Sequence, residues 1–314
     1  MRALLRYGRR PCMDKGNNVK PYIAGVVFAV LVGFSFLSVK VCVPIASTIE
    51  ILAFRYDFAL MGASVLVILK VAGFPRLKGK KNAALFWSAG FYVLFMIFQA
   101  MGLIFSTSVE AAIMFAIIPI ITKIIAGFFL KEKSTPAQNI FVFMSVSALI
   151  FMIAMSAGDF TVNIRGIIIL IMSSVCLAIS NVLMRYVREI HNPFEITYTV
   201  SFIGFMVFNI GYIIYLIAEK GSAISYFAPC SNYEFILSTA YLGIACIVAS
   251  SWLMSYMLTR LEAVKATIFG NLSTAVSIIA GIVILNEPFV FYNVICTAII
   301  IAGVIGVSAT GRRE

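Results

Sequence analysis

Long apolar runs separated by short polar links make up most of this chain. We read ten such runs, at about residues 22–43, 51–71, 83–105, 109–130, 139–157, 165–187, 194–218, 234–257, 264–285 and 289–309. Each approaches the roughly 20 residues that a helix needs to cross the hydrocarbon core of a bilayer. Lipid does not tolerate unsatisfied backbone groups, and a β-barrel would show short alternating segments instead. The pattern therefore predicts an all-α integral membrane protein with ten transmembrane helices.

The composition agrees with lipid as the main solvent of the chain. Of its 314 residues, 62% are hydrophobic and 12% are charged, and the mean hydropathy is +1.03. Soluble domains are about 45–50% apolar and about 25% charged. The six cysteines show no CxxC spacing, and we interpret them as small apolar residues. The links are mostly short, which leaves no room for a soluble domain.

Basic residues gather on alternate links. Most of the 24 Lys and Arg residues fall in the two tails or on one set of links, whereas Arg165 and Lys220 fall on the other set. By the positive-inside rule, both termini are expected in the cytoplasm, with the chain in the cell (plasma) membrane. Anionic lipid beside these links accounts for the net charge of +11 without nucleic acid. Residues 1–21 are expected to form a basic tail, with either Met1 or Met13 as the start.

The chain also repeats itself. A shift of 145 residues places Lys40 opposite Arg185 and Glu50 opposite Glu195, and a shift of 154 aligns the sequence IIAG at 124–127 with IIAG at 278–281. The two repeats span residues 22–157 and 165–309, with five runs in each. Because five is odd, the second copy must cross the membrane in the opposite sense. Inverted repeats of this kind are common in secondary transporters, where the substrate site lies between the halves near mid-depth.

These features resemble the EamA family of the drug/metabolite transporter superfamily. The resemblance rests on the ten runs, on the paired endings FFLKEK (128–133) and VILNEP (283–288), and on the segment from Tyr241 to Pro288. It covers about residues 20 to 309. The resemblance implies an exporter or exchanger of small metabolites, with a central cavity lined by the first four helices of each half. In that family the fifth and tenth helices are peripheral.

Lys123 is the sharpest candidate for a substrate-binding residue, because an ionisable group inside a span is costly and marks a functional site by default. It lies about 13 residues into the fourth run, or roughly 20 Å deep. Ala112, Ala116, Pro119 and Gly127 share its helix face. Lys123 either extends to the cytoplasmic headgroups or points into a wet cavity, where it would attract an anionic or carboxylate-bearing substrate.

Arg55 and Asp57 lie in the outer third of the second run, two residues apart, so they do not face each other directly. Arg55 either forms a structural ion pair or interfacial contact near Glu50, or acts in a gate or substrate site. The other substrate-binding candidates are polar or aromatic residues inside the runs: Gln99, Asn181, Asn271, Ser277 and Trp252. Their alternative roles are interhelical hydrogen bonding, close packing and, for Trp252, interfacial anchoring. Asn209, in the seventh run, is either a substrate-binding residue or a partner in an interhelical hydrogen bond.

Glu132 and Glu287 end the two paired runs, and we interpret them as turn and capping residues. Each is soon followed by a proline, which suits the first turn of a helix. A carboxylate at that position faces the positive end of the helix dipole. The pairs Thr107 with Glu110 and Thr259 with Glu262 fit capping boxes. Gating is the alternative role for Glu132 and Glu287.

The chemistry needed by most enzymes is missing from the sequence. There is one histidine, His191, and no HExxH, GxSxG or Walker A motif, so we expect no cofactor, metal or enzymatic activity. The best interpretation is a secondary transporter that exports or exchanges a small metabolite, such as an amino acid, a nucleoside-type compound or an amphipathic drug-like compound, by alternating access. An intramembrane enzyme and a channel or scaffold are the alternatives. The expected partners are the small-molecule substrate and the lipid bilayer; a homodimer and a coupling proton stay open.

Overall fold

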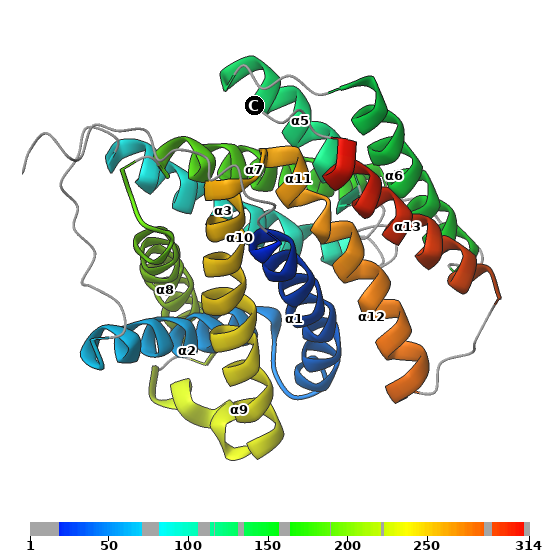
Figure 1. Cartoon of the computed structure of the whole chain (residues 1–314). Coiled ribbons are helices and arrows are strands. Elements are labelled where there is room, and N and C mark those ends of the chain that lie inside the picture. Colours follow the sequence, from blue (N-terminus) through cyan, green and yellow to red (C-terminus); the bar gives the residue numbers. More distant parts are fainter. Residues whose placement is uncertain are drawn as a thin grey trace, which may run out of the picture.

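The computed structural model describes residues 19–70, 82–105, 114–115, 117–130, 135–156, 164–188, 190–220, 223–285 and 291–310, and most of these residues are helical (Figure 1). The helices of the first half are α1 (Lys20–Cys42), α2 (Thr48–Ile68), α3 (Asn82–Phe105), α5 (Ile118–Phe129) and α6 (Pro136–Ser156). The second half contains α7 (Ile164–Val187), α8 (Pro193–Lys220), the 3₁₀ helix η2 (Ala223–Ser231), α9 (Tyr233–Ala240), the π-helix η3 (Tyr241–Ala249), α10 (Ser250–Arg260), α11 (Ala263–Thr267), α12 (Phe269–Leu285) and α13 (Phe291–Thr310). The all-α prediction is confirmed for the described residues.

Wherever the structure describes the predicted apolar runs, most of their residues lie in one helix or in consecutive helices. Within the described residues, five helical stretches are long and apolar enough to cross a membrane: Thr48–Ile68, Asn82–Gly102, Ile164–Val187, Pro193–Glu219 and Tyr233–Arg260. Shorter apolar helices occur at Lys20–Ser35, Ile118–Phe129 and Ala298–Val307. The molecule is therefore a multi-span helical protein of the membrane type, and the number of ten crossings stays a prediction.

The outside of the bundle is apolar. Ile68, Phe128 and Val283 are among many large apolar side chains that face outward, with exposed fractions of 75%, 79% and 71%. A soluble monomer rarely presents a contiguous apolar surface of this extent. Hydrocarbon is the solvent that such a surface fits.

Two of the predicted runs are interrupted rather than continuous. In the ninth run, α11 ends at Thr267 and α12 begins at Phe269, with Ile268 in a turn. The Thr267 hydroxyl donates to the carbonyl oxygens of Ala263 and Val264, at 3.0 and 3.2 Å, and so competes with the helix ladder. In the fourth run, α5 begins at Ile118 with Pro119 in its first turn, where a missing N–H costs nothing.

The eighth run contains the π-helix η3 between α9 and α10. At the end of η3, the backbone N–H of Ser250 donates to Ala245, five residues back, while the Ser250 hydroxyl donates to the carbonyl of Cys246 at 2.6 Å. The hydroxyl therefore takes the acceptor that an α-helical bond from Ser250 would use. Single π turns are rare and occur frequently at functional sites.

Helix pairs in the two halves pack in equivalent ways. In the repeat, α1 corresponds to α7, α2 to α8, α3 to the stretch of η3 and α10, and α5 to α12. Helix α1 packs against α12 and α10, and its counterpart α7 packs against α5 and α3. In the same way, α2 packs against η3, and its counterpart α8 packs against α3. The remaining large contacts join α2 to α8 and α6 to α13, which are counterparts of each other. Figure 1 shows α1 between α10 and α12, with α11 and α5 near one end of the molecule and α9 near the other.

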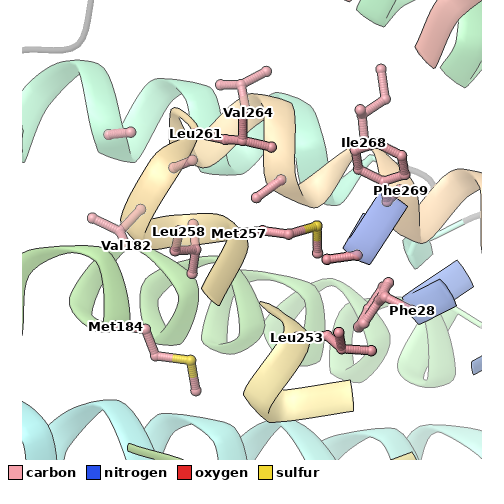
Figure 2. Close-up of a cluster of buried hydrophobic side chains, with 14 of the residues drawn as sticks. Phe28, Val182, Met184, Leu253, Met257, Leu258, Leu261, Val264, Ile268 and Phe269 are labelled. Carbon is pink, nitrogen blue, oxygen red and sulfur yellow. The ribbon is translucent and has the colours of Figure 1, made fainter. Parts of the chain in front are cut away.

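The largest buried apolar cluster joins the halves through α1. Figure 2 shows Phe28 of α1 beside Leu253 and Met257 of α10 and Phe269 of α12. A Cβ atom at Gly25 would lie 2.7 Å from the ring of Phe269, so only glycine lets this ring rest on the α1 backbone. The seam between α1 and α12 therefore depends on a small residue at this point.

Helix starts account for several of the acidic and amide side chains. Glu50 accepts a hydrogen bond from the backbone N–H of Ser47 at 2.8 Å, and Glu195, its repeat counterpart, accepts one from the N–H of Asn192 at 3.1 Å. At the start of α6, the N–H of Thr135 donates to Gln138 and the N–H of Gln138 donates to the Thr135 hydroxyl. This reciprocal pair is a capping box.

The predicted capping box at Thr259 is wrong. Helix α10 continues through Thr259, and the Thr259 hydroxyl donates to the carbonyl of Tyr256 at 2.6 Å within that helix. Glu262 takes the N-cap position of α11, without a side-chain capping bond. Thr107, Glu110, Glu132 and Glu287 lie outside the described residues.

Candidate functional site

Arg55 is a partly buried cation at the α2–η3 contact, and no counter-ion for it is found among the described residues. Its Nε atom is buried and has no hydrogen-bond partner in the described part of the chain. Its guanidinium lies close enough to the hydroxyls of Tyr56 and Tyr92 and to the thiol of Cys246 to interact with them electrostatically. From the start of α2, Arg55 lies about 10 Å along the helix axis. A buried guanidinium N–H without a partner is costly, so this site is suited to an anionic ligand.

The π-helix η3 holds Arg55 in place through its backbone. A Cβ atom at Gly243 would lie 2.5 Å from the Arg55 carbonyl oxygen and 2.8 Å from the backbone nitrogen of Ala59. Glycine at this position therefore allows η3 and α2 to approach more closely than any other residue would permit. Cys246, one turn further along η3, lies near Arg55 and donates to the carbonyl of Leu31 in α1 at 3.4 Å.

Three buried hydroxyl groups on the surrounding helices lack hydrogen-bond partners within the described ranges: Tyr56 of α2, Ser201 of α8 and Ser255 of α10. Tyr56 stacks on Phe208 of α8, with ring centroids 5.0 Å apart, and its ring lies against Gly204. Ser251 lies near the Tyr92 hydroxyl, and Ser255 follows it by four residues on the same helix face. Buried polar groups usually have partners, so these hydroxyls are candidates for contact with a ligand or water.

A polar cluster lies on the other side of α2. Asn209 of α8 donates to the Asp57 carboxylate at 2.7 Å, and Tyr226 of η2 donates to the same carboxylate at 2.8 Å. Tyr226 also contacts the Asn209 side-chain oxygen. The interhelical hydrogen bond suggested for Asn209 is therefore present.

Glu50 extends this network toward the end of the molecule that carries α9. Tyr212 of α8 donates to Glu50 at 3.3 Å and approaches the carbonyl of Tyr226 at 3.0 Å. Burial, together with the hydrogen bond to Asp57 and its charge, raises the pKa of Tyr226 far above its ordinary value, so its phenol stays protonated. Next to Glu50 is an open pocket of about 620 Å³, lined by Ile45, Pro229, Asn232 and Glu234, among others.

The opposite end of the bundle is tied by polar bonds between helices. Gln138 of α6 donates to Glu262 at 3.1 Å, and Lys265 lies 3.6 Å from the same carboxylate. Arg188 donates to the carbonyl of Leu258 at the end of α10 at 2.8 Å, and Arg185 donates to the same carbonyl at 3.2 Å. These cations sit where the helix dipole of α10 is negative.

Lys123 lies away from the Arg55 site. Its ammonium group donates to the side chain of Asn139, at the start of α6. Asn139 also lines an open apolar groove between α6 and α13 with Phe143 and Ile299. Both proposed roles for Lys123, extension to the headgroups and contact with substrate, stay predictions, but its observed partner belongs to its own half of the chain.

The remaining candidates are scattered over several helices. Asn181 of α7 is buried, Gln99 of α3 and Ser277 of α12 are half-buried, and Asn271 of α12 donates to Ser145 of α6 at 3.5 Å. Trp252 of α10 is 45% exposed and stacks on Tyr256, with ring centroids 6.2 Å apart. The structure does not bring these side chains together around Arg55, and their roles in substrate binding stay predictions.

The sequence singles out Arg55, Asp57 and Asn209, but not the other residues around them. Tyr226 lies in the link between the seventh and eighth runs, and no pattern in the sequence distinguishes it. Ser251 carried no signal either, because one hydroxyl in an apolar run is common in membrane helices. Gly243 could have been noticed as an isolated glycine within a run, which often marks close helix contact.

Comparison with known proteins adds a family and a fold. Residues 19–154 and 164–309 match the EamA-like transporter family. The "Uncharacterized transporter YcxC" of Bacillus subtilis (strain 168) is 34% identical over 304 residues, which cover 94% of this chain and 94% of that protein. An "Uncharacterized transporter" of Archaeoglobus fulgidus is 23% identical over 287 residues, covering 91% and 98% of the two chains. A solved crystal structure with 14% identity has a TM-score of 0.76 and covers 94% of this chain and 98% of its own, and so shares the fold.

Proposed function

Since the chain belongs to the EamA-like transporter family, and is thus a membrane transporter, we propose that it is a secondary carrier, rather than an enzyme, for small metabolites that bear a carboxylate or another anionic group. It exports or exchanges them by alternating access. The observation that carries this proposal is Arg55, whose buried Nε has no partner in the described residues. Amino acids and acidic nucleoside-type compounds fall within this class; a purely apolar drug does not.

Arg55 is proposed to bind the anionic group of the substrate. A guanidinium presents a fork of N–H donors that matches a carboxylate in two parallel hydrogen bonds. The ligand would replace the hydration that Arg55 loses inside the bundle. Tyr92, which lies near Arg55, and Ser251, which lies near Tyr92, are suited to hydrogen-bond the rest of the substrate. The aromatic and aliphatic side chains of α2, α3 and η3 supply the apolar wall.

We also propose that the fold consists of two inverted five-helix repeats. The equivalent helix pairings of the two halves support this arrangement. So does the shared capping role of Glu50 and Glu195, which are 145 residues apart in the sequence. With both termini in the cytoplasm, the end that carries Gln138 and Glu262 faces inward. The bonds at that end support a conformation closed to the cytoplasm, with the pocket beside Glu50 on the outer side.

Counterflow in proteoliposomes tests the proposed function. Purified protein is reconstituted, the vesicles are loaded with one unlabelled compound from a panel of amino acids, organic acids, nucleosides and cationic drugs, and uptake of the labelled compound is followed. We expect saturable uptake, stimulated by internal substrate, for carboxylate-bearing compounds. Uptake confined to cationic drugs would contradict the substrate class. Conductance that does not saturate would favour a channel, and chemical turnover of the compound would favour an enzyme.

A further inference from the structure

We propose that Asp57, Asn209 and Tyr226 form a proton-binding site, and that its proton is taken up together with the anion at Arg55. The coupling to transport rests on the proposed function, whereas the proton site itself rests on the geometry of these three side chains. They come from three different elements, α2, α8 and η2, and meet inside the bundle.

The three side chains form an almost closed ring of hydrogen bonds. The Asn209 amide donates to one Asp57 oxygen at 2.7 Å, and Tyr226 donates to the other at 2.8 Å. The Tyr226 oxygen is also in contact with the side-chain oxygen of Asn209. Asn209 is held in this orientation by a second bond, from its amide to the carbonyl of Phe205 at 3.1 Å.

While Asp57 is ionised, the ring is one proton short of a complete set of hydrogen bonds. Tyr226 has one hydroxyl proton and two acceptors within reach, Asp57 and Asn209, so it can serve only one of them while Asp57 is ionised. If Asp57 binds a proton on the oxygen nearest Tyr226, that carboxyl group donates to Tyr226. Tyr226 can then donate to Asn209, and Asn209 donates to the other Asp57 oxygen. Every donor and acceptor in the ring is then used, and no other group needs to move.

No cation neutralises Asp57 in its ionised form within the described residues. The charged or titratable groups on the elements packed around it are the following: Glu50, Arg55 and Tyr56 of α2; Glu195, Tyr198, Tyr212, Tyr215, Glu219 and Lys220 of α8; Tyr226 and Cys230 of η2; Tyr233 and Glu234 of α9; and Tyr241 and Cys246 of η3. Two of these are cations. Arg55 lies near Tyr92 and Cys246, with no ion pair to Asp57 among the described residues, and Lys220 is the last residue of α8, about 16 Å along the helix axis from Asn209. A carboxylate held by an amide and a phenol, without a cation, is well suited to bind and release a proton.

The position of Asp57 couples the proton to the substrate. Asp57 and Arg55 are two residues apart on α2, so an ionised Asp57 repels an anion bound at Arg55. Protonation removes this repulsion, and at a separation of roughly 10 Å in a partly polar interior the effect is on the order of tenfold in affinity. The anion and the proton therefore favour each other's binding, which is the requirement for moving together.

Infrared difference spectroscopy of the reconstituted full chain tests the site without relying on transport. Acidification of the wild type should produce the band of a protonated carboxyl group. This band should be absent in Asp57→Asn and retained in the matched control Glu234→Gln, since Glu234 is an exposed acid at the outer pocket. The asparagine can still accept from Asn209 and donate to Tyr226, so this variant keeps the ring and the fold. Tyr226→Phe should shift the titration midpoint of the band to higher pH, because it removes the hydroxyl that donates to the ionised carboxylate. A band that persists unchanged in Asp57→Asn would overturn the proposal.

Transport supplies the second arm, with the carboxylate that the counterflow panel identifies. In the wild type its apparent affinity should rise about tenfold as the outer pH falls through the infrared midpoint. In Asp57→Asn the affinity should stay at the high value at every pH. The same pH dependence in wild type and Asp57→Asn would refute the coupling. If no carboxylate is transported while the infrared band behaves as expected, the proposed function fails and the proton site stands.

Discussion

The side-chain amide of Gln138 donates a 3.1 Å hydrogen bond to the carboxylate of Glu262, and so joins the start of α6 to the start of α11. The two residues are 124 positions apart in the sequence and belong to different halves of the chain. Gln138 also completes the capping box with Thr135. One side chain thus both begins a helix and ties the halves together at the end proposed to face the cytoplasm.

A change at Gln138 separates these two roles. Gln138→Glu keeps an acceptor for the N–H of Thr135 but places a carboxylate against Glu262, so we expect a loss of about 1 kcal/mol in the free energy of unfolding. The double variant Gln138→Glu with Glu262→Gln restores a donor and an acceptor in reversed order, and should recover most of the lost free energy of unfolding. Thermal unfolding in detergent measures the loss in the single and the double variant. Equal losses in the single and double variants would show that the bond does not join the halves.

Arg55→Ala should weaken substrate binding most. The loss of a charge-assisted hydrogen bond is worth about 1.5–3 kcal/mol, which corresponds to roughly a 10- to 150-fold rise in the apparent half-saturation constant. Arg55→Lys keeps the positive charge but loses the paired N–H donors of the guanidinium, so its half-saturation constant should fall between those of the wild type and Arg55→Ala. Lys123→Ala is the comparison, since Lys123 is the sharpest candidate from the sequence alone, and we expect a smaller rise in the half-saturation constant. A larger effect at Lys123 would move the substrate site to α5.

Gly243→Ala should destabilise the protein, because the added methyl group meets the Arg55 carbonyl at 2.5 Å. Overpacking of this kind costs about 1–3 kcal/mol. Gly90→Ala is the matched control: Gly90 is a helical glycine of α3 whose added Cβ meets nothing within 4 Å. The control should be neutral or slightly stabilising, since alanine favours helices over glycine. Similar melting temperatures for the two variants would contradict the close α2–η3 contact.

Cys230 should react slowly with alkylating reagents. Burial first, and then the charge of Asp57, raises the pKa of its thiol above the usual value of 9.0, so less thiolate is present at pH 8 than for a free cysteine. Because the folded-state pKa lies above the unfolded value, the stabilising effect of the neutral thiol is full below pH 9 and is lost as the pH rises above it. Alkylation rates measured by mass spectrometry between pH 7 and 10 should keep rising past pH 9. In Asp57→Asn the rate at pH 8 should increase, and a plateau below pH 9 would disprove the raised pKa.

The helical stretch Tyr233–Arg260 should cross the membrane from outside to inside. Tyr233→Cys and Arg260→Cys place a thiol at each end, in a background whose native cysteines are replaced by alanine or serine. An impermeant maleimide should label position 233 in intact cells and position 260 only after the cells are opened. Labelling of both positions in intact cells would refute the proposed orientation.

The helices could be predicted from the sequence because a run of apolar residues leaves few alternatives in lipid. The interruptions could not, because they depend on which carbonyl a hydroxyl reaches: Thr267 and Ser250 look like many other hydroxyl residues in membrane helices. Thr259 misled the capping prediction for the same reason, since a hydroxyl inside a helix can bond its own backbone as readily as cap the next helix. Glu50 and Glu195 align at a shift of 145 residues because each caps the start of a helix that both repeats have kept.

The candidate site was only half visible in the sequence. Arg55 and Asp57 were found because charges inside apolar runs are costly and few. Their partners come from α3, α8, η2 and η3, and only the packing of these helices decides that Tyr92 lies near Arg55 and Tyr226 near Asp57. Lys123 is the sharper candidate from the sequence because it lies deep in the fourth run. Depth along a run, however, does not determine which neighbouring helix the side chain contacts.

The equivalent helix pairings have a thermodynamic consequence. If one half of the bundle tilts against the other, each contact opened at one end, such as α1 on α12, has a counterpart, such as α7 on α5, that can close at the other. The two forms then differ in free energy by a few kcal/mol at most, as in other two-state proteins. On the proposed mechanism, so small an intrinsic bias would leave the direction of net transport to the solute and proton gradients that the cell maintains. Reversing those gradients should reverse the transport.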